Sequence, residues 1–241
     1  MRPPGLEILA DTPTFVVVNK PSGLLSIADR AGVDLSLKQL LDQQYGKVFT
    51  VHRLDRDTSG AIIFAKDEVT HQHLSRQFEG RQVKKYYRGF IHGQPPSPAG
   101  SMDGPIMEHP VKLGTMIVHA KGKASLTDYT VLESFGILSY VEFQIHTGRT
   151  HQIRVHVKDL GHPIAGDPIY GDGQPVFLSG IKRKFKLSKY MEEERPILGR
   201  LALHAWKLQF NDAEGHPWEI EAPLPKDMRA LLQQLRKWRS A

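Results

Sequence analysis

The sequence predicts an α+β fold built on a mixed, largely antiparallel sheet. Strand-like and helix-like segments are interspersed along the 241 residues, without the regular strand–helix–strand period of a doubly wound parallel sheet. Several segments alternate apolar and polar residues, as half-buried strands do. The hydrophobic fraction is 40%, which is ordinary for a globular protein, and a chain of this length can bury a sizeable core.

The N-terminal part of the chain is expected to hold short strands and two helices. Pro21 and Gly23 mark a turn after the first strands. Leucines at 37, 40 and 41 repeat at helical spacing, with Asp34 or Ser36 as the cap. The elements are strands at 6–9 and 15–18, a turn at 19–23, this helix, and a second helix from about 67.

The rest of the chain is expected to be richer in strands. The predicted strands are 84–92, 125–132, 139–145, 201–210 and 218–220, with a proline-rich loop at 94–100 and a short helix at 150–160. A final helix runs from about 226 to 238. Its apolar positions lie on one face, at Met228, Leu231, Leu232 and Leu235, so we expect this helix, including Trp238, to pack on the core.

Composition narrows the class of partner and of chemistry. The net charge is +6 and the pI is about 9.4, which favours a polyanionic partner such as nucleic acid, although a merely soluble basic protein has the same balance. The chain has no cysteine, which excludes disulfides, thiolate catalysis and cysteine-based zinc sites. Since no signal peptide and no long apolar run are visible, we expect a cytoplasmic protein without a membrane partner.

One segment is strongly basic, with aromatic residues between its lysines. It covers 181–190, precedes three glutamates at 192–194, and lies in a predicted basic insertion loop at 173–199. We interpret it as a mobile hairpin or loop that contacts RNA. The alternative is a solvated insertion whose charges cancel against the glutamates. The predicted RNA contacts are Lys182, Arg183, Lys184 and Lys186.

The segment His-Arg-Leu-Asp-Arg-Asp-Thr-Ser-Gly at 52–60 places the carboxylate of Asp55 between two arginines. Apolar residues before and after it predict a strand, a loop and a strand, and a loop held by rigid neighbours often carries catalytic groups. An Asp beside cations stays ionised, so it can act as a nucleophile or base. The alternative is that Asp55 merely braces the loop through Arg53 or Arg56.

Two further segments carry polar and aromatic groups that could join Asp55. Residues 147–156, Thr-Gly-Arg-Thr-His-Gln-Ile-Arg-Val-His, place two arginines and two histidines where a strand ends and a helix begins. An arginine there can bind the carboxylate of Asp55 bidentately and hold it ionised. Residues 85–93 offer an aromatic ring that could stack on a base.

In this order, these segments resemble the RluA-type RNA pseudouridine synthases. The strongest motif is Arg-Leu-Asp-Arg-Asp-Thr-Ser-Gly at 53–60, and Asn-Lys-Pro-Ser-Gly-Leu-Leu at 19–25 is similar to the family's first motif. Residues 148–156 with 161–167 are similar to its third, and Leu-Ala-Leu-His-Ala at 201–205 to the strand that closes its pocket. The resemblance runs from about residue 6 to residue 224.

The resemblance implies a pseudouridine synthase fold, with helices and loops flanking the sheet around a central cleft. Residues 1–241 would then form a single catalytic domain, without a separate N-terminal S4-like RNA-binding domain. The substrate would be a uridine in ribosomal RNA or in a tRNA stem-loop, with a slight preference for tRNA because recognition would rest on the catalytic domain and the basic segment. No obligate protein partner is implied, and a monomer is expected.

The resemblance also assigns roles to residues. Asp55 attacks or deprotonates the ribose, and Arg154 forms an ion pair with it. Arg53 fills the gap left when the uridine flips out of its stack, a step that costs a few kcal/mol. Tyr87 stacks on the uracil and acts in the final proton removal, and Leu203 is an apolar wall of the pocket.

Other residues of these motifs are candidates for binding the substrate. They are Thr58, Arg149 and His151. Tyr86 competes with Tyr87 for the stacking role, and counting back from the glycine at 93 favours Tyr87.

The reaction implied by the resemblance transfers no hydride or electron, so no cofactor is expected. Histidines at 146, 151, 156 and 162 suggest zinc, but their spacings do not match the i, i+4 pair of a zincin helix, and no metal site is predicted. One competing function is a non-catalytic RNA-binding relative with the same fold. Another is a carboxylate glycosidase, which would need a second acid flanking the bond, and Asp57 is the nearest carboxylate in sequence.

Overall fold

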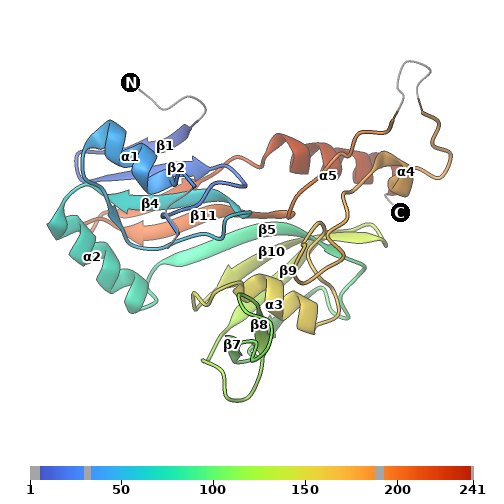
Figure 1. The fold of residues 1–241 in the computed structure, drawn as a ribbon, viewed down its shortest axis with the longest axis horizontal. Helices are drawn as coiled ribbons and strands as arrows, with labels where there is room; N and C mark the ends of the chain where they lie inside the picture. The colour runs from blue at the N-terminus through green and yellow to red at the C-terminus, as the bar shows by residue number, and fades with distance from the viewer. Residues whose placement is uncertain (1–5, 30–33, 188–192, 240–241) are drawn as a thin grey trace. The chain divides into compact units, whose positions relative to one another are not determined.

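The computed structural model describes residues 6–29, 34–187 and 193–239 of the chain (Figure 1). They form two compact units. The first comprises the chain up to Tyr87 together with His204–Pro223, and the second comprises Arg88–Leu203 together with the chain from Leu224 onward. The expectation of a single catalytic domain over 1–241 stays a prediction.

The first unit is a mixed sheet whose strands follow the order β1-β2-β4-β11. Neighbouring strands are antiparallel except β4 and β11, which run parallel with Ser59 opposite His204. The short strand β3 pairs with β4, and β12 pairs with β11, both in antiparallel orientation. The elements are β1 Glu7–Asp11, β2 Phe15–Lys20, α1 Leu37–Tyr45, β3 Phe49–Thr50, β4 Ser59–Ala65, α2 Glu68–Glu79, β11 Leu203–Asn211 and β12 Pro217–Glu221.

The core of this unit follows from its apolar strands. Every residue of β4 is buried, and the first four residues of β2 are buried beside it. The side chains that pack together here come from β2, β4, α2 and β11, and they include Phe15, Ile63, Leu74 and Phe210. Capping places the helices: Ser36 and its N3 residue Gln39 form a capping box at α1, and the Asp67 side chain accepts from the Thr70 amide at 2.8 Å to begin α2.

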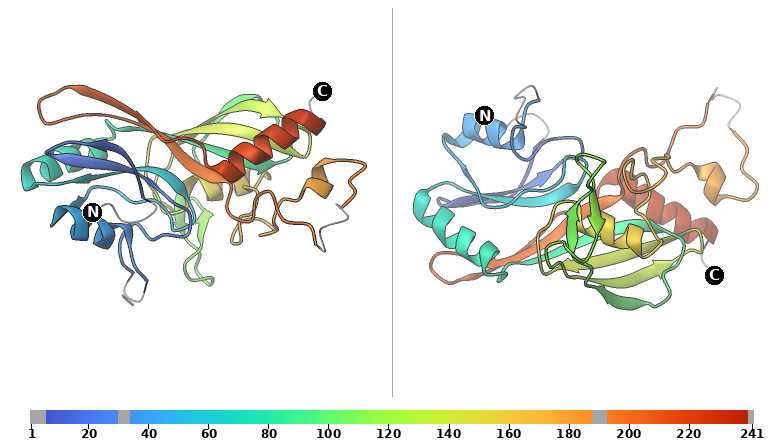
Figure 2. Two further views of the ribbon diagram at one scale, coloured as in Figure 1. Left: turned by 90° about the horizontal axis from the view of Figure 1, so that it is seen from above. Right: turned by 60° about the horizontal axis from the view of Figure 1, so that its bottom comes forward.

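The second unit contains the strand order β5-β10-β9-β6, where β5 (Lys84–His92) enters the unit at Arg88. The ladders β10–β9 and β9–β6 are antiparallel. Strands β7 and β8 form a separate antiparallel ribbon beside α3 (Figure 2). The remaining elements are β6 Ala99–Met102, β7 Ile106–Glu108, β8 Met116–Val118, β9 Thr127–Ser134, β10 Leu138–Ile145, α3 Gln152–Asp159, α4 Leu178–Ile181 and α5 Lys226–Arg239.

The predicted α+β class and its largely antiparallel sheet are confirmed. The exceptions are short elements. Strands β7 and β8 were not expected, and the loop predicted at 94–100 gives way to β6 at Ala99. Three-residue strands such as β7 are too short to show periodicity, so pattern reasoning does not find them. Among the described residues, no helix combines the length and the apolar composition that crossing a bilayer requires.

The segment 173–199 was predicted to be a basic insertion loop, and the structure adds regular elements to it. It contains the short helix α4, and an antiparallel bridge between Val176 and Leu198 closes its base. The Val176 amide donates to the Leu198 carbonyl at 2.8 Å. Residues 188–190 of the basic run, and Glu192 after it, lie outside the described residues.

Candidate active site

Asp55 lies in the first unit, on the loop between β3 and β4 that the sequence predicted. It is half-buried, whereas Arg53 is exposed and Leu54 is buried beneath the loop. The Thr58 amide donates to the Asp55 carbonyl at 3.2 Å, which turns the chain directly into β4. The carboxylate is therefore carried by a short loop whose two ends are fixed in the sheet.

A buried lysine holds this loop from below. The side chain of Lys20, at the end of β2, is fully buried. Its ammonium donates to three backbone carbonyls, those of Pro21 at 3.0 Å, Leu24 at 2.7 Å and Arg56 at 2.8 Å. A buried ammonium is stable only when its hydrogen bonds are satisfied. Lys20 thus ties the turn after β2 to the residue that follows Asp55.

The same turn makes further hydrogen bonds to the Asp55 loop. The Ser22 hydroxyl donates to the Asp57 carbonyl at 2.7 Å. The Gly23 amide donates to the Arg56 carbonyl at 2.9 Å, and the Arg56 Nε returns a bond to the Gly23 carbonyl at 3.2 Å. The 19–23 segment was interpreted as a turn that also contacts RNA. The turn is present, and its hydrogen bonds brace the Asp55 loop. Its contact with RNA stays a prediction.

A small pocket lies between the continuation of this turn and the loop. Ser26 and Leu54 bind each other, because the Ser26 hydroxyl donates to the Leu54 carbonyl at 2.8 Å and accepts from the Leu54 amide at 3.1 Å. The pocket has a volume of about 290 Å³ and is lined by Leu25, Ser26, Ile27, Ala28, Asp29, Arg53, Leu54 and Arg56. Two arginines thus border a cavity next to Asp55.

The Thr-Ser-Gly end of the motif packs against β11. Thr58 is buried. The Ser59 hydroxyl lies 2.9 Å from Nδ1 of His204, whose Nε2 donates to the Ala222 carbonyl at 3.2 Å. Gly60 has φ of +122°, and a Cβ there would lie 2.1 Å from the Ala205 carbonyl oxygen. Position 60 must be glycine because the two parallel strands approach too closely for a side chain.

Tyr87 is buried in the same unit as Asp55. Burial raises the pKa of its phenol, and the negative charge of Asp55 raises the pKa further. The hydroxyl therefore stays protonated at neutral pH, within electrostatic reach of the carboxylate. Tyr86 is half-buried, with the Lys207 Nζ 5.2 Å from its ring centroid. The choice of Tyr87 over Tyr86 stays a prediction, which this charge interaction favours.

His52, the first residue of the motif segment, is held neutral. Its Nε2 accepts a hydrogen bond from the Ile63 amide at 3.2 Å, and its ring stacks on Phe78 at 4.5 Å between centroids. Burial, assisted by the positive charge of Lys85, lowers the pKa of His52 to about 3. The pKa of Lys85 is itself lowered to about 8, by burial and then by the charge of Arg81. Sequence reasoning assigned no role to His52.

Arg154, in the second unit, is buried and paired with Asp167. Its Nε and Nη2 donate to the two carboxylate oxygens at 2.7 and 2.8 Å. Amides of Ile169 and Tyr170 also donate to Asp167. Burial acts to raise the pKa of Asp167, but the bonds and charge of Arg154 together with these amides outweigh it, so the pKa is lowered. The pairing of Arg154 with Asp55 stays a prediction.

Sequence reasoning missed Asp167 as the partner of Arg154. The available signal was its place at the end of the 161–167 motif, directly after Gly166. A Cβ at Gly166 would lie 2.3 Å from the Arg200 carbonyl, so the chain passes close to another segment just before the carboxylate. The carboxylate is thus placed by backbone packing as well as by its arginine.

His151 begins α3 in a left-handed conformation, with φ of +55°. This conformation costs a non-glycine residue of the order of 1 kcal/mol, so other contacts must hold it. Its Nδ1 lies 2.8 Å from the Tyr170 hydroxyl, which also accepts from the Met116 amide at 2.8 Å. The Arg154 guanidinium lies 5.0 Å from the Tyr170 ring centroid. Tyr170 therefore links two predicted site residues of the second unit.

The other predicted substrate-binding residues of the second unit are Arg149 and Leu203. Arg149 is half-buried, and its Nε donates to the Ala124 carbonyl at 3.2 Å. Leu203 is buried, and a Cβ at Gly89 would lie 3.3 Å from its Cδ1. The roles of Arg149, His151, Leu203 and, in the first unit, Thr58 stay predictions.

The four histidines considered for zinc each have a different partner. His146 donates to Asp128 at 2.6 Å, His156 to the Gly104 carbonyl at 2.9 Å, and His162 to the His92 carbonyl at 2.8 Å. His151 bonds Tyr170, as described above. Among the described residues, the groups close enough to share an ion are Asp212, Glu214 and His216. Asp212 there accepts from Trp218 and from the turn amides, so it shapes the β11–β12 turn.

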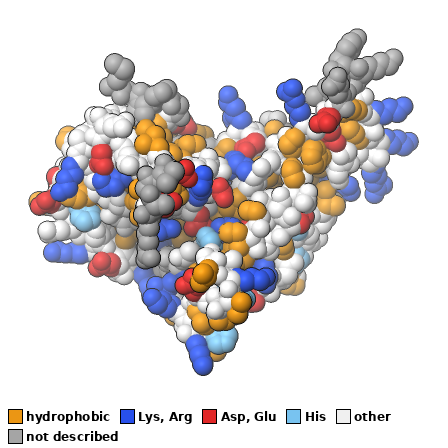
Figure 3. All heavy atoms as spheres, in the orientation of Figure 1, with side chains coloured by type: hydrophobic (Ala, Val, Ile, Leu, Met, Phe, Trp, Pro, Cys, Tyr) orange, Lys and Arg blue, Asp and Glu red, His pale blue; other side chains and the backbone are white. Residues whose placement is uncertain are grey.

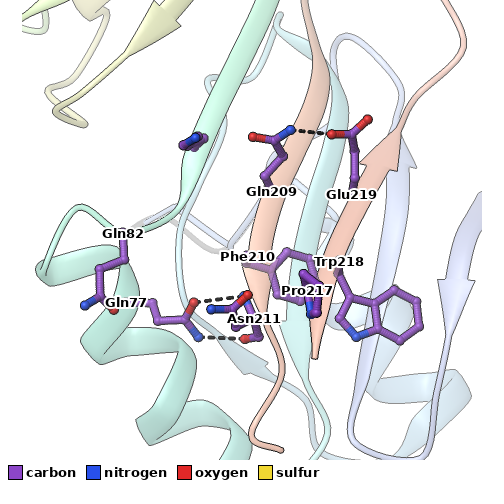
Figure 4. A pocket seen from close by; sticks show the side chains of 9 residues that line it. Gln77, Gln82, Gln209, Phe210, Asn211, Pro217, Trp218 and Glu219 are labelled. Atoms are coloured by element: carbon purple, nitrogen blue, oxygen red, sulfur yellow. Dashed lines mark hydrogen bonds between the residues drawn. The ribbon is translucent and has the colours of Figure 1, made fainter. Parts of the chain in front are cut away.

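A further pocket lies away from these motifs (Figure 4). It measures about 670 Å³, at the end of β11 opposite the Ser59–His204 contact. Its amides are engaged in the fold: Gln77 Nε2 donates to the Asn211 carbonyl at 2.7 Å and its Oε1 accepts from the Asn211 amide at 3.0 Å, while Gln209 bonds Glu219. The carboxylate in this lining, Glu219, is the one that binds Gln209, and no residue of the predicted motifs lines the pocket.

Comparisons with known proteins agree with the motif pattern. A family model described as RNA pseudouridylate synthase matches residues 14–159. The ribosomal large subunit pseudouridine synthase D of Nitrosomonas europaea is 36% identical over 242 residues, which are 96% of this chain and 65% of that protein. The protein of the same name from Neisseria meningitidis serogroup B is also 36% identical, over 98% of this chain and 62% of its own length. The chain thus spans less than two thirds of these two relatives.

Two further similar proteins extend this comparison. The RNA pseudouridine synthase YlyB of Bacillus subtilis, itself uncharacterized, is 33% identical over 98% of this chain and 75% of its own length. The solved structure of human RNA pseudouridylate synthase domain containing 4 superposes with a TM-score of 0.72 and 28% identity. That alignment covers 95% of this chain and 93% of the human one.

Proposed function

Since the chain belongs to the RNA pseudouridylate synthase family, we propose that it isomerises uridine to pseudouridine in RNA, with Asp55 as the catalytic carboxylate. Enzymes of this family are isomerases. The observation that carries the proposal is the placement of Asp55, half-buried on a braced loop and within electrostatic reach of the protonated phenol of Tyr87. The proposed reaction needs a positioned carboxylate to act on the ribose and a neutral aromatic ring to lie against the uracil.

The reaction breaks the bond between ribose C1′ and uracil N1 and joins C1′ to C5 of the same ring. The proton on C5 is then lost and N1 gains one, so the product is an isomer of the substrate and nothing is oxidised. Asp55 starts the reaction either by attacking C1′ or by taking a ribose proton. Either route needs the target nucleotide outside its stack, and Arg53, exposed at the start of the loop, is proposed to fill the gap.

Tyr87 is proposed to lie against the uracil and to act when the C5 proton leaves. A phenol with a raised pKa is not a base at neutral pH. To accept the C5 proton, Tyr87 must pass its own proton to a carboxylate, and Asp55 is the carboxylate whose charge it senses. The two groups would therefore work as a pair. We retain Arg154 as the proposed ion-pair partner of Asp55.

For the substrate we propose ribosomal RNA. The relatives from Nitrosomonas and Neisseria are named as synthases of the large ribosomal subunit, and both are 36% identical to this chain. This outweighs the slight preference for tRNA that the sequence suggested. Binding should depend on salt, because neutralised phosphates release counterions.

The decisive test is Asp55→Asn, assayed on ribosomal RNA transcripts by chemical mapping of pseudouridine. The amide keeps the shape of the side chain but can neither attack nor accept a proton, so we expect the rate to fall by at least about 100-fold. The affinity of this variant for RNA should stay close to that of the wild type. As a control, Asp57→Asn, two residues away, should retain activity.

The second candidate function is RNA binding without catalysis. It would be supported if the wild-type chain bound the transcripts but left every uridine unmodified. Pseudouridine formation by Asp55→Asn at the wild-type rate would reject Asp55 as the catalytic group while leaving the isomerase assignment in place.

A further inference from the structure

A basic patch in the second unit surrounds one exposed tryptophan. We define the Trp238 patch as Lys182, Arg183, Lys184, Lys186, Lys237 and Trp238. Its members come from the segment after α4 and from the last turn of α5. Figure 3 shows lysine and arginine side chains gathered at the edge where Figure 1 places the ends of these two helices. The tertiary structure therefore joins two basic segments that are far apart in the sequence.

The last turn of α5 is bound directly to α4. Arg239 donates from Nε to the Ile181 carbonyl at 2.8 Å and from Nη2 to the Gly180 carbonyl at 3.2 Å. Lys182 follows at once, and its Nζ lies 4.5 Å from the Trp238 ring centroid. The basic run thus starts at a fixed point beside the tryptophan.

Trp238 is the end of the apolar stripe of α5, but it extends beyond the core. Met228, Leu231, Leu232 and Leu235 are buried, whereas Trp238 is 41% exposed. The prediction that this helix packs on the core therefore applies to its earlier turns, while Trp238 stays partly open to solvent. Its indole Nε1 donates to the Gln234 side chain at 3.1 Å, which fixes the orientation of the ring.

The helix that presents Trp238 is anchored at both ends. Arg200 binds Asp227 bidentately near the start of α5, at 2.6 and 2.8 Å. Arg236 binds Glu133 of β9 through two hydrogen bonds, one of them 2.8 Å long. None of these bonds involves the Trp238 ring, so a ligand would meet a ring carried by a helix that is already anchored.

The charge around Trp238 is strongly positive. Arg183, Lys184, Lys186 and Lys237 are exposed, and the Lys237 Nζ lies 5.1 Å from the ring centroid. Among the described residues nearby in sequence, the acidic groups are Glu193, which is exposed, and Glu194, which accepts from the Ser179 amide. An exposed aromatic ring among cations is the combination that stacks on an unpaired base and neutralises the phosphates beside it.

We propose that the Trp238 patch binds a single-stranded segment of the RNA substrate, with Trp238 stacked on an unpaired base and the five cations on the adjoining phosphates. This inference rests on the proposed function, because it assumes that the substrate is RNA. It goes further by assigning a second contact, carried by α5, to RNA outside the stem-loop that holds the target uridine.

The test compares two labelled RNAs in the Asp55→Asn background, where the substrate is not converted. One is a stem-loop, and the other is the same stem-loop with a single-stranded tail of about eight nucleotides. In fluorescence anisotropy, Trp238→Ala should weaken binding of the tailed RNA by about 10-fold. Trp238→Phe should retain most of the affinity, and the RNA without a tail should bind all variants equally.

A matched pair of lysines on α5 tests the electrostatic part. Lys237→Ala should reduce the dependence of log K on log salt by about 0.7, the value for one lost contact to a single strand. Lys226→Ala, in the first turn of the same helix, should leave that slope unchanged. Both lysines are exposed, so neither variant should alter folding.

Tryptophan emission reports the stacking itself, even if Trp238→Ala does not fold. The tailed RNA should quench part of the emission of the chain, which has three tryptophans, and Trp238→Phe should abolish that part. Unchanged affinity in Trp238→Ala, or quenching that persists in Trp238→Phe, would overturn the proposal. So would quenching by phosphatidylglycerol vesicles but not by RNA, because a basic amphipathic helix can also bind a membrane surface.

The outcomes separate this inference from the proposed function. A chain that forms no pseudouridine, yet loses affinity for the tail in Trp238→Ala, would reject the reaction and support the RNA site. A chain that modifies RNA normally and binds both RNAs alike in every variant would support the reaction and reject the site.

Discussion

Individual residues around the Asp55 loop are held in defined protonation states. His52 must be unprotonated at Nε2, because that atom accepts a hydrogen bond from the Ile63 amide. Tyr87 stays a neutral phenol because burial and the charge of Asp55 both oppose its ionisation. Burial thus opposes the charged form of both side chains.

The histidine makes the stability of the protein depend on pH. Burial lowers the pKa of His52 to about 3 in the folded chain, below the ordinary value of 6.5. Between these values the unfolded chain binds a proton that the folded chain does not. The contribution of neutral His52 to the free energy of unfolding is therefore complete above pH 6.5 and is lost as the pH falls toward 3. Between pH 6.5 and 4.5 this loss amounts to about 2 kcal/mol.

Urea unfolding of the wild type and of His52→Gln at several pH values measures this effect. Glutamine offers an oxygen to the Ile63 amide but does not titrate, so the variant should lose about 2 kcal/mol less over the same interval. Parallel pH profiles for the two proteins would show that other groups cause the loss.

At the scale of elements, the turn after β2 positions the candidate active site. It leads from β2 toward α1 and binds the Asp55 loop through Lys20, Ser22, Gly23 and Ser26. The turn and the loop are distant in sequence but share a set of backbone bonds. This explains how a loop can keep a half-buried carboxylate in one place.

Replacing Lys20 with methionine should show what the brace contributes. Methionine fills a similar volume but leaves three carbonyls without the ammonium, so we expect the free energy of unfolding to fall by about 3 kcal/mol. The turnover number should fall as well, because the Asp55 loop loses its anchor, while RNA affinity should change little. Urea unfolding and single-turnover assays measure the two effects.

Lys38→Met is the matched control. Lys38 pairs with Asp42 on the surface of α1 at 2.7 Å, and such i, i+4 pairs contribute about 0.5 kcal/mol. This variant should be nearly as stable and as active as the wild type. If Lys20→Met behaved like the control, the brace would have no energetic role.

The whole molecule combines a basic surface with a proposed reaction that needs no oxidant or reductant. Its net charge of +6 favours RNA, and five of the cations form the Trp238 patch. Long-range attraction of this kind increases the rate of encounter with RNA and weakens with salt. We propose that the chemistry itself is carried out by the carboxylate of Asp55 and the phenol of Tyr87.

We therefore expect full activity without a metal ion. Pseudouridine formation on a transcript folded in potassium should be unchanged by EDTA, because proton transfer and nucleophilic attack by Asp55 require no Lewis acid. Gel mobility of the transcript checks that the RNA remains folded. Activity that EDTA removes and zinc or magnesium restores, with the RNA folded throughout, would contradict the expectation.

The sequence by itself determined the order and type of the longer elements and the loop that carries Asp55. These features depend on neighbours along the chain: apolar runs make β2 and β4, the Asp67 cap starts α2, and Gly60 ends the motif. Even so, the Thr-Ser-Gly end of the motif reads from the sequence as a turn, and this prediction is wrong because Ser59 and Gly60 lie in β4. The close approach of Ala205, which excludes any side chain there, required the β4–β11 pairing.

Only the tertiary structure decided which distant groups meet. Arg154 pairs with Asp167, Lys20 donates to the Arg56 carbonyl, and the Lys182 ammonium lies over the Trp238 ring. No local pattern encodes these pairs, because a charged side chain can satisfy many partners and the fold selects among them by bringing strands, turns and helix ends together. Periodicity indicates which face of an element is buried. Which other element packs against that face depends on the path of the whole chain.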